Sequence, residues 1–276
     1  MTDLAPPSPN SPNSPNSRSF RSFRSFRSSG SSPPGRRTLL RWLALACAAG
    51  IGLPALAQQA PGRYTESRRS ADGIGKRYLG RDISGVMGWQ GAAWLEREER
   101  EREERGDLLL RELGLKPGMA VADIGAGTGY YARRIAPLVG TGEGGGVVYA
   151  VDVQPEMIQM LGDLAKKANL TNIKPVLCTV DNVKLLEASI DVAIMVDVYH
   201  ELEFPFEVME SVVRALKPGG RVVYVEYRAE DPKVPIKPLH KMSEAQVKKE
   251  AAAHALVYER TAHTLPWQHV VVFRKR

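Results

Sequence analysis

Residues 121–130, VADIGAGTGY, constrain the fold of this chain more than any other stretch. An apolar run that contains an acid and opens into three alternating glycines is typical of a strand that turns tightly into a helix. Gly125, Gly127 and Gly129 let the backbone come close to a ligand, and the free amide groups of the following helix point toward it. Glycine-rich turns also arise for steric reasons alone, so this pattern by itself indicates only that a nucleotide-like ligand fits here.

The spacing of these glycines differs from the fingerprint of dinucleotide-binding proteins. In that fingerprint, G-x-G-x-x-G, a third glycine would stand where this chain has Tyr130. The difference argues against an enzyme that uses NAD.

From residue 119 on, apolar runs alternate with helical segments, which is the signature of parallel βαβ units. Ligands of such sheets lie beyond the carboxyl ends of the strands, so the residues after each strand are candidates for a site. The sequence therefore predicts an α/β sandwich. Strands are expected near residues 119–124, 147–152, 173–178, 190–196 and 220–226, and helices near 129–138, 155–168 and 203–217.

Asp152 ends the second of these strands, 23 residues after Gly129. A carboxylate at this place can accept hydrogen bonds from both hydroxyl groups of a ribose. It can also cap the next helix, because Pro155 suits the first position of a helix. Because the glycine turn precedes Asp152 by the spacing typical of nucleotide-binding folds, ribose binding is favoured.

The net charge of +7 raises the question of a nucleic-acid partner. Residues 1–57 contain seven arginines and one acid, which leaves 31 basic and 30 acidic residues in the remainder. Apart from local clusters such as Lys248 and Lys249, nothing after residue 57 has the charge of a surface that binds a phosphate backbone. We therefore expect no nucleic-acid partner.

Residues 1–57 are expected to contain a tail and a targeting signal. Residues 1–35 repeat P-N-S and R-S-F, a composition predicted to form a disordered low-complexity tail. Residues 36–57 combine paired arginines with a short apolar stretch and a final A-L-A, and resemble a bacterial export signal of the twin-arginine type. A periplasmic or secreted protein without a stable membrane span after cleavage is expected. A mitochondrial transit peptide and an uncleaved anchor are the alternatives, and the protein stays in the cytoplasm if the signal is not used.

Residues 58–105 are expected to form a linker, which either stays flexible or closes over a pocket as a lid, followed by a charged helix. The helix should cover residues 94–113. Exposed pairs at i,i+4 contribute only about 0.3–0.5 kcal/mol each, so we predict a solvated helix with no part in the chemistry. The expected pairs are Glu96 with Arg100, Glu98 with Arg102, and Glu101 with Arg105.

Four motifs in order resemble a class I S-adenosylmethionine-dependent methyltransferase over residues 106–276. They are the glycine turn, YAVD at 149–152, residues 191–201 at the fourth strand and LKPGGR at 216–221. The resemblance implies a Rossmann-like sheet of seven strands with helices on both faces and an antiparallel last strand, with residues 256–260 and 268–274 as the final pair. Residues 80–105, placed after an export signal, are similar to bacterial secreted methyltransferase-like proteins.

The resemblance also implies S-adenosylmethionine as the cofactor and assigns residues to it. An Asp-Asn pair such as Asp181 and Asn182 can also simply form a turn. Asp123, Gly125, Gly127 and Gly129 are expected at the methionine portion, Asp152 at the ribose, Asp181 with Asn182 at the adenine, and Asp197 also at the cofactor.

Tyr199, His200 and Glu201 follow the fourth strand, where the transferred methyl group should point, and are the candidate catalytic residues. Methyl transfer is an in-line displacement, so the enzyme mostly aligns its substrates and sometimes supplies a base. His200 is the preferred base because histidine ordinarily titrates near neutrality. A structural histidine bonded to the next helix is the alternative. No metal is expected, and Cys178 as the one thiol left after signal removal argues against a structural zinc site.

The chain lacks the Asn/Asp-Pro-Pro-aromatic motif of amino-group methylases and the Pro-Cys nucleophile of pyrimidine methylases, so a small-molecule acceptor is expected. Residues 226–228 and 231–240 are predicted as a loop on the ligand side, with 263–267 as a second one, and these loops either shape the acceptor pocket or only connect strands. A non-catalytic sensor or scaffold that binds the same cofactor is the alternative function. An exported enzyme would also need methyl donor from outside, or donor carried out in the folded protein.

Overall fold

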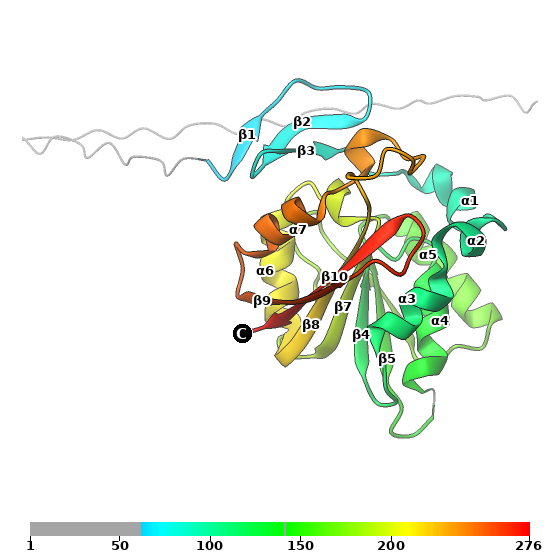
Figure 1. The fold of residues 1–276 in the computed structure, drawn as a ribbon. Helices are drawn as coiled ribbons and strands as arrows, with labels where there is room; N and C mark the ends of the chain where they lie inside the picture. Colours follow the sequence, from blue (N-terminus) through cyan, green and yellow to red (C-terminus); the bar gives the residue numbers. More distant parts are fainter. Residues whose placement is uncertain (1–61, 141) are drawn as a thin grey trace, which may run out of the picture. The chain divides into compact units, whose positions relative to one another are not determined.

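The computed structural model describes residues 62–140 and 142–276 (Figure 1). The predicted tail at 1–35 and the predicted export signal at 36–57 lie outside the described residues. The compact unit that holds all the described elements begins at Gln58. Within the described ranges, no helix has both the length and the apolar content needed to cross a membrane.

A seven-stranded sheet forms the centre of this unit, in the order β6-β5-β4-β7-β8-β10-β9 (Figure 1). Strands β4 to β8 run parallel, and β10 is antiparallel to both β8 and β9. The predicted fold, including the antiparallel last strand, is confirmed. The strands are β4 (Ala120–Ile124), β5 (Val147–Asp152), β6 (Ile173–Leu177), β7 (Ile190–Val196), β8 (Leu216–Tyr227), β9 (Leu256–Ala262) and β10 (Gln268–Lys275).

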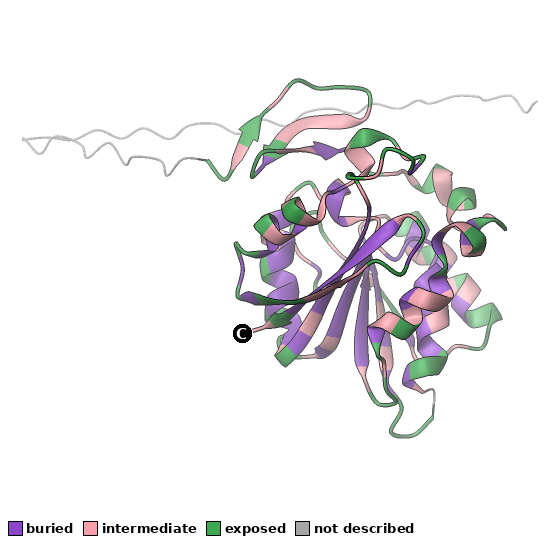
Figure 2. Cartoon of the chain, in the orientation of Figure 1, coloured by how far each residue is buried: buried purple, intermediate pink, exposed green. Residues whose placement is uncertain are grey.

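Helices cover both faces of the sheet, and each face has its own apolar core (Figure 2). Alternate residues of one strand face opposite cores: Ala122 of β4 packs with α6 and α7, and Val121 packs with α3 and α4. Burial on both faces explains why these strands read as unbroken apolar runs. The helices are α3 (Gly106–Leu113), α4 (Tyr130–Val139), α5 (Pro155–Lys167), α6 (Pro205–Ala215) and α7 (Glu244–Ala251).

A second, three-stranded antiparallel sheet forms where a linker or lid was expected. It consists of β1 (Tyr64–Glu66), β2 (Gly73–Tyr78) and β3 (Arg81–Ser84). Tyr78 and Ile83 of this sheet are almost fully buried, which a flexible linker would not achieve. Arg81 donates to both oxygens of Glu250 on α7, at 2.7 and 2.9 Å, and to the carbonyl oxygen of His200 at 3.0 Å. The small sheet is therefore docked on α7 and on the turn that contains His200.

The predicted single helix over residues 94–113 is broken into three. A 3-10 turn, η1 (Trp89–Gly91), precedes α1 (Ala92–Leu95) and α2 (Arg100–Glu104), and α3 follows. Arg105, between α2 and α3, has a left-handed backbone with φ of 53°. This turn changes the direction of the chain, so the residues that face one another differ from those of a continuous helix.

Candidate active site

A cavity of about 590 Å³ lies at the carboxyl ends of the parallel strands, as the fold predicts. This volume is typical of sites for small molecules. Much of its wall is apolar and comes from β2, the segment around Met87, α1 and the loop before η3 (Pro238–His240). Six of the predicted site residues line it, namely Gly125, Gly127, Asp152, Asp197, His200 and Glu201.

The glycine turn leaves no room for side chains. Gly125 has φ of 69°, and a Cβ atom added there would lie 2.3 Å from Cγ2 of Val198. Its amide donates to the carbonyl oxygen of Val151 at 2.8 Å, which ties the turn to β5. Gly129 has φ of 83° and lies against Leu161 of α5, so its role is to let α4 and α5 pack closely and it does not line the cavity.

Asp152 both supports the turn and faces the cavity. Its Oδ2 accepts a hydrogen bond from the amide of Gly127 at 2.9 Å, and its Oδ1 accepts one from the amide of Gln154, also at 2.9 Å. The carboxylate thus links the glycine turn to the residue that precedes α5. Burial raises its pKa.

Gln154 forms two contacts that the sequence did not indicate. Its side-chain oxygen accepts from the amide of Trp89 at 2.8 Å, and its side-chain nitrogen donates to the carbonyl oxygen of Met87 at 3.0 Å. The loop before α5 therefore holds the segment that forms one wall of the cavity.

Three other predicted residues lie away from the cavity wall. Asp123 is 3% exposed and lies inside β4. Asp181 is exposed and accepts from the hydroxyl of Thr179 at 2.7 Å, in a turn whose residues Thr179 and Val180 do line the cavity. Tyr199 is fully buried in the core, with its ring 5.0 Å from that of Tyr224.

Asp123 carries a pH dependence that can be measured. Burial raises its pKa to about 7, and its Oδ2 has no hydrogen-bond partner in the described part of the chain. The unfolded chain releases this proton near pH 4, so the free energy of unfolding falls as pH rises from about 4 to 7. We expect Asp123→Asn to reduce the stability lost between pH 5 and pH 8 by about 1–2 kcal/mol in urea titrations. An unchanged pH dependence would contradict this assignment.

His200 is the centre of a cluster at the ends of β7 and β8. It lies in the short turn η2 (Tyr199–Glu201), is 2% exposed, and its Nδ1 is 2.6 Å from Oε2 of Glu226. Glu226 also accepts from the amide of Tyr199 at 3.0 Å. A carboxylate at Nδ1 places the proton there and leaves Nε2 free.

Glu226 and His240 were predicted only as parts of a loop on the ligand side, and the sequence did not single them out as site residues. Residues 226–227 were expected in a loop, but β8 extends to Tyr227 because it pairs with β10 as far as Gln268. The one available signal for Glu226 was an acid near the end of a predicted strand. His240 reaches the cavity from the expected 231–240 loop, whereas residues 263–267 contribute nothing to its lining.

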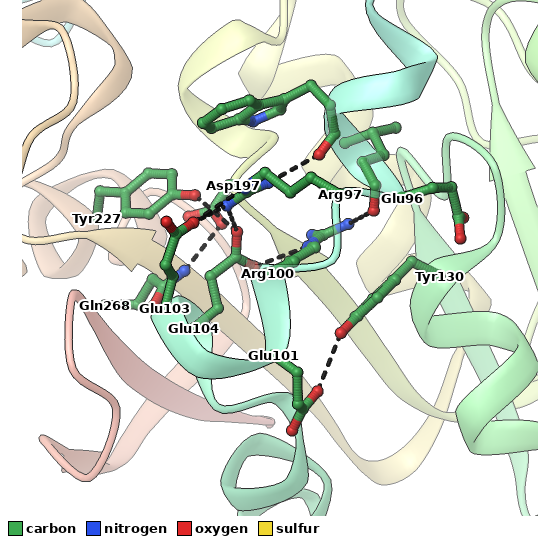
Figure 3. Close-up of polar contacts among 12 residues, drawn as sticks. Glu96, Arg97, Arg100, Glu101, Glu103, Glu104, Tyr130, Asp197, Tyr227 and Gln268 are labelled. Carbon is green, nitrogen blue, oxygen red and sulfur yellow. Dashed lines mark hydrogen bonds and ion pairs between the residues drawn. The ribbon is translucent and has the colours of Figure 1, made fainter.

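Two residues of the charged segment that was expected to be solvated, Arg100 and Glu104, are buried and line the cavity, whereas Glu98 and Arg102 are exposed as expected. Figure 3 shows the polar contacts of this segment. Arg100 and Glu104 are 5% and 2% exposed, and Nε of Arg100 donates to Oε2 of Glu104 at 2.9 Å. Oε1 of Glu104 accepts from Arg97 at 2.8 Å and from the hydroxyl of Tyr227 at 3.0 Å. The Arg100 guanidinium also lies 4.1 Å from the ring centre of Tyr130. Arg100 and Glu104 thus form an i,i+4 pair other than the expected ones, with further partners on β8 and α4.

Asp197 lies next to this network in a left-handed conformation, with φ of 52°. The side-chain amide of Gln268 donates to its Oδ2 at 3.1 Å, and its Oδ1 is buried without a partner among the described residues (Figure 3). Burial, with the nearby charges of Glu104 and Glu226, raises the pKa of Asp197 well above its ordinary value. Oδ1 of Asp197 is thus a buried hydrogen-bond acceptor in a residue that lines the cavity described above.

Residues 115–270 match the model of the methyltransferase domain family. Among solved structures, a SAM dependent methyltransferase from Aquifex aeolicus is 25% identical with a TM-score of 0.65, over 69% of this chain and 100% of that one. The ubiquinone/menaquinone biosynthesis C-methyltransferase UbiE of Ectopseudomonas mendocina is 30% identical over 41% of this chain and 44% of its own length. Protein-L-isoaspartate O-methyltransferase 1 of Arabidopsis thaliana is 32% identical over 42% and 49%. The chain spans less than half the length of these two curated relatives.

Proposed function

The chain belongs to the class I S-adenosylmethionine-dependent methyltransferases, and we propose that it methylates a small, largely apolar acceptor. The observation that carries this proposal is that the glycine turn, Asp152 and His200 line the same cavity. The glycine turn follows β4, Asp152 ends β5, and His200 lies in η2 after β7. In the sheet β4 lies between β5 and β7. A cofactor over β4 and β5 can thus direct its methyl group toward the histidine.

The buried charges beside the cavity suit the amino-acid end of the cofactor. That end carries one carboxylate and one ammonium group. Arg100 lines the cavity with a guanidinium, and Asp197 offers an oxygen that lacks a partner in the described chain. We assign the cofactor carboxylate to Arg100 and its ammonium to Asp197, with the ribose on Asp152.

In this proposal the acceptor lies among the apolar residues in front of His200, where Met87, Leu202 and Ile236 line the cavity. Nε2 of His200 takes the acceptor proton, and Glu226 holds the ring and stabilises its charged form. The acceptor atom then bonds to the methyl carbon while the carbon–sulfur bond breaks and its electron pair stays on sulfur. The wall around the acceptor favours apolar molecules with one acidic group.

The test uses S-adenosylmethionine with a labelled methyl group and a panel of phenols and quinols, with tRNA and unfolded protein as competing acceptors. Quinols belong in the panel because one relative is named for ubiquinone and menaquinone biosynthesis. We expect the label in the fraction extracted by organic solvent, and its loss in the Asp152→Ala variant. Label in precipitated macromolecules would overturn the proposal. Cofactor binding without any transfer would favour the sensor or scaffold instead.

A further inference from the structure

We propose that His200, Glu201 and His240 bind a divalent transition-metal ion in the acceptor half of the cavity. One nitrogen or oxygen atom from each residue lies within 4.8 Å of the others. Oε1 of Glu201 is 3.8 Å from Nε2 of His200 and 3.4 Å from Nδ1 of His240. Ligand atoms around tetrahedral zinc are about 3.3–3.6 Å apart, given bonds of about 2.0–2.2 Å. Small side-chain rotations would therefore complete a site of two imidazoles and one carboxylate.

The distances within the cluster distinguish it from a hydrogen-bonded one. The distances from Oε1 of Glu201 to the two histidine nitrogens are both longer than the 2.7–3.2 Å of an ordinary N–H···O bond. The three groups thus lie close together while Glu201 makes no short hydrogen bond to either histidine. Two histidines and a carboxylate form a ligand set suited to zinc, iron and related divalent ions.

Two of the three ligands are already oriented by further contacts. Glu226 holds Nδ1 of His200, which leaves Nε2 available, and a carboxylate behind a histidine is the usual support of a metal ligand. The amide of Met87 donates to Oε2 of Glu201 at 3.1 Å, which leaves Oε1 available. Glu226 and the Met87 amide are positioning groups of the proposed site.

Charge balance also favours a cation. Glu201 and Glu226 bring two carboxylates to a largely buried place. Arg81 reaches the same turn through the carbonyl oxygen of His200, but its charge is matched by Glu250, to which it donates twice. A divalent ion would balance the two remaining carboxylates.

This inference rests on the proposed function and narrows the acceptor to a molecule with a hydroxyl oxygen that can coordinate the ion. All three ligands line the cavity, so the open coordination positions face the acceptor. The ion would lower the pKa of the bound hydroxyl, whose proton leaves to solvent. The oxygen then bonds to the methyl carbon as the carbon–sulfur bond breaks and its electron pair stays on sulfur. In the metal-bound enzyme His200 acts as a ligand, and the ion replaces it as the group that promotes loss of the proton.

The test is zinc titration of the untagged full chain after chelator treatment, with a competing indicator. We expect one site per chain with submicromolar affinity. His240→Ala and Glu201→Gln should each weaken it at least tenfold, and Glu226→Gln ten- to a hundredfold. His263→Ala is the matched control, because His263 is an exposed histidine 3.5 Å from Glu244 and should bind zinc no differently. Zinc binding that survives Glu201→Gln and His240→Ala, or no zinc binding by the unmodified chain, would overturn the proposal.

Two further measurements separate this site from other outcomes. Cobalt(II) substitution should give a visible spectrum without a thiolate charge-transfer band. Such a band would assign the ion to Cys178, which also lines the cavity, and would overturn the ligand set. S-adenosylhomocysteine should bind the metal-free chain and its His240→Ala variant equally. If zinc binds as described but S-adenosylhomocysteine does not bind, the result supports the metal site and contradicts the proposed methyl transfer.

Discussion

Glu104→Gln is expected to lower the free energy of unfolding by about 3–5 kcal/mol, the usual effect of removing one partner from a buried ion pair. Glu104 is 2% exposed and accepts from Arg97, Arg100 and Tyr227. The neutral amide leaves the guanidinium of Arg100, which is 5% exposed, without its matching charge. Urea titration monitored by circular dichroism measures the change.

Asp107→Asn is the matched control for this prediction. Asp107 also lies near two arginines, Arg105 and Arg111, but its side chain is 36% exposed. Exposed pairs contribute little to stability, so the control should change the free energy of unfolding much less than Glu104→Gln does. Adding Arg100→Met to Glu104→Gln should restore part of the loss, because the double variant no longer buries that unmatched charge. Equal effects of Glu104→Gln and Asp107→Asn would show that the buried network does not stabilise the fold as we describe.

His200→Gln is expected to lower kcat by about 10²–10⁴, the usual contribution of a general base, with the acceptor found in the labelling experiment. Glutamine keeps a polar side chain beside Glu226 but cannot take up the proton or replace the imidazole as a metal ligand. The affinity for S-adenosylhomocysteine should be unchanged, because the cofactor is assigned to Asp152, Arg100 and Asp197 and not to His200.

His254→Gln provides the control for His200. Nδ1 of His254 lies 2.7 Å from Oε1 of Glu210, so both histidines have a carboxylate partner and are buried, but His254 does not line the cavity. The control should keep its kcat within about threefold. Activity retained by His200→Gln would leave His200 with a structural role, the alternative that the sequence left open.

The half of the site at β4 and β5 was predictable from the sequence because its residues follow directly from local spacing. Gly125 and Gly127 must come after an apolar strand, and Asp152 must end the next one. The period of the apolar residues fixes the strands, and parallel strands bring their carboxyl ends to one edge of the sheet.

The other half depends on contacts between segments that are far apart in the sequence. Glu226 contacts His200 from β8, and His240 lies in η3, after a loop whose path no local pattern fixes. A histidine and an acid that are 26 residues apart give no periodic signal. The sequence shows which residue types are present, but it does not show that these residues lie together in the fold.

The charged segment shows a different limit. Alternating Arg and Glu residues favour a solvated helix when a continuous 3.6-residue period is assumed. The left-handed turn at Arg105 interrupts that period, and Tyr227 and Arg97 then supply buried partners for Glu104. Burial of charge depends on such tertiary partners, which helix propensity does not contain.

Calorimetric titration of the full chain with S-adenosylhomocysteine, alongside Asp152→Ala, tests the central claim most directly. We predict micromolar binding by the unmodified chain, weakened in the variant by about 1–3 kcal/mol because polar groups lose their partner. Glu156→Ala serves as a control, since Glu156 is an exposed acid at the start of α5. Failure of the unmodified chain to bind, or equal binding by Asp152→Ala, would contradict the assignment of this cavity to the methyl donor.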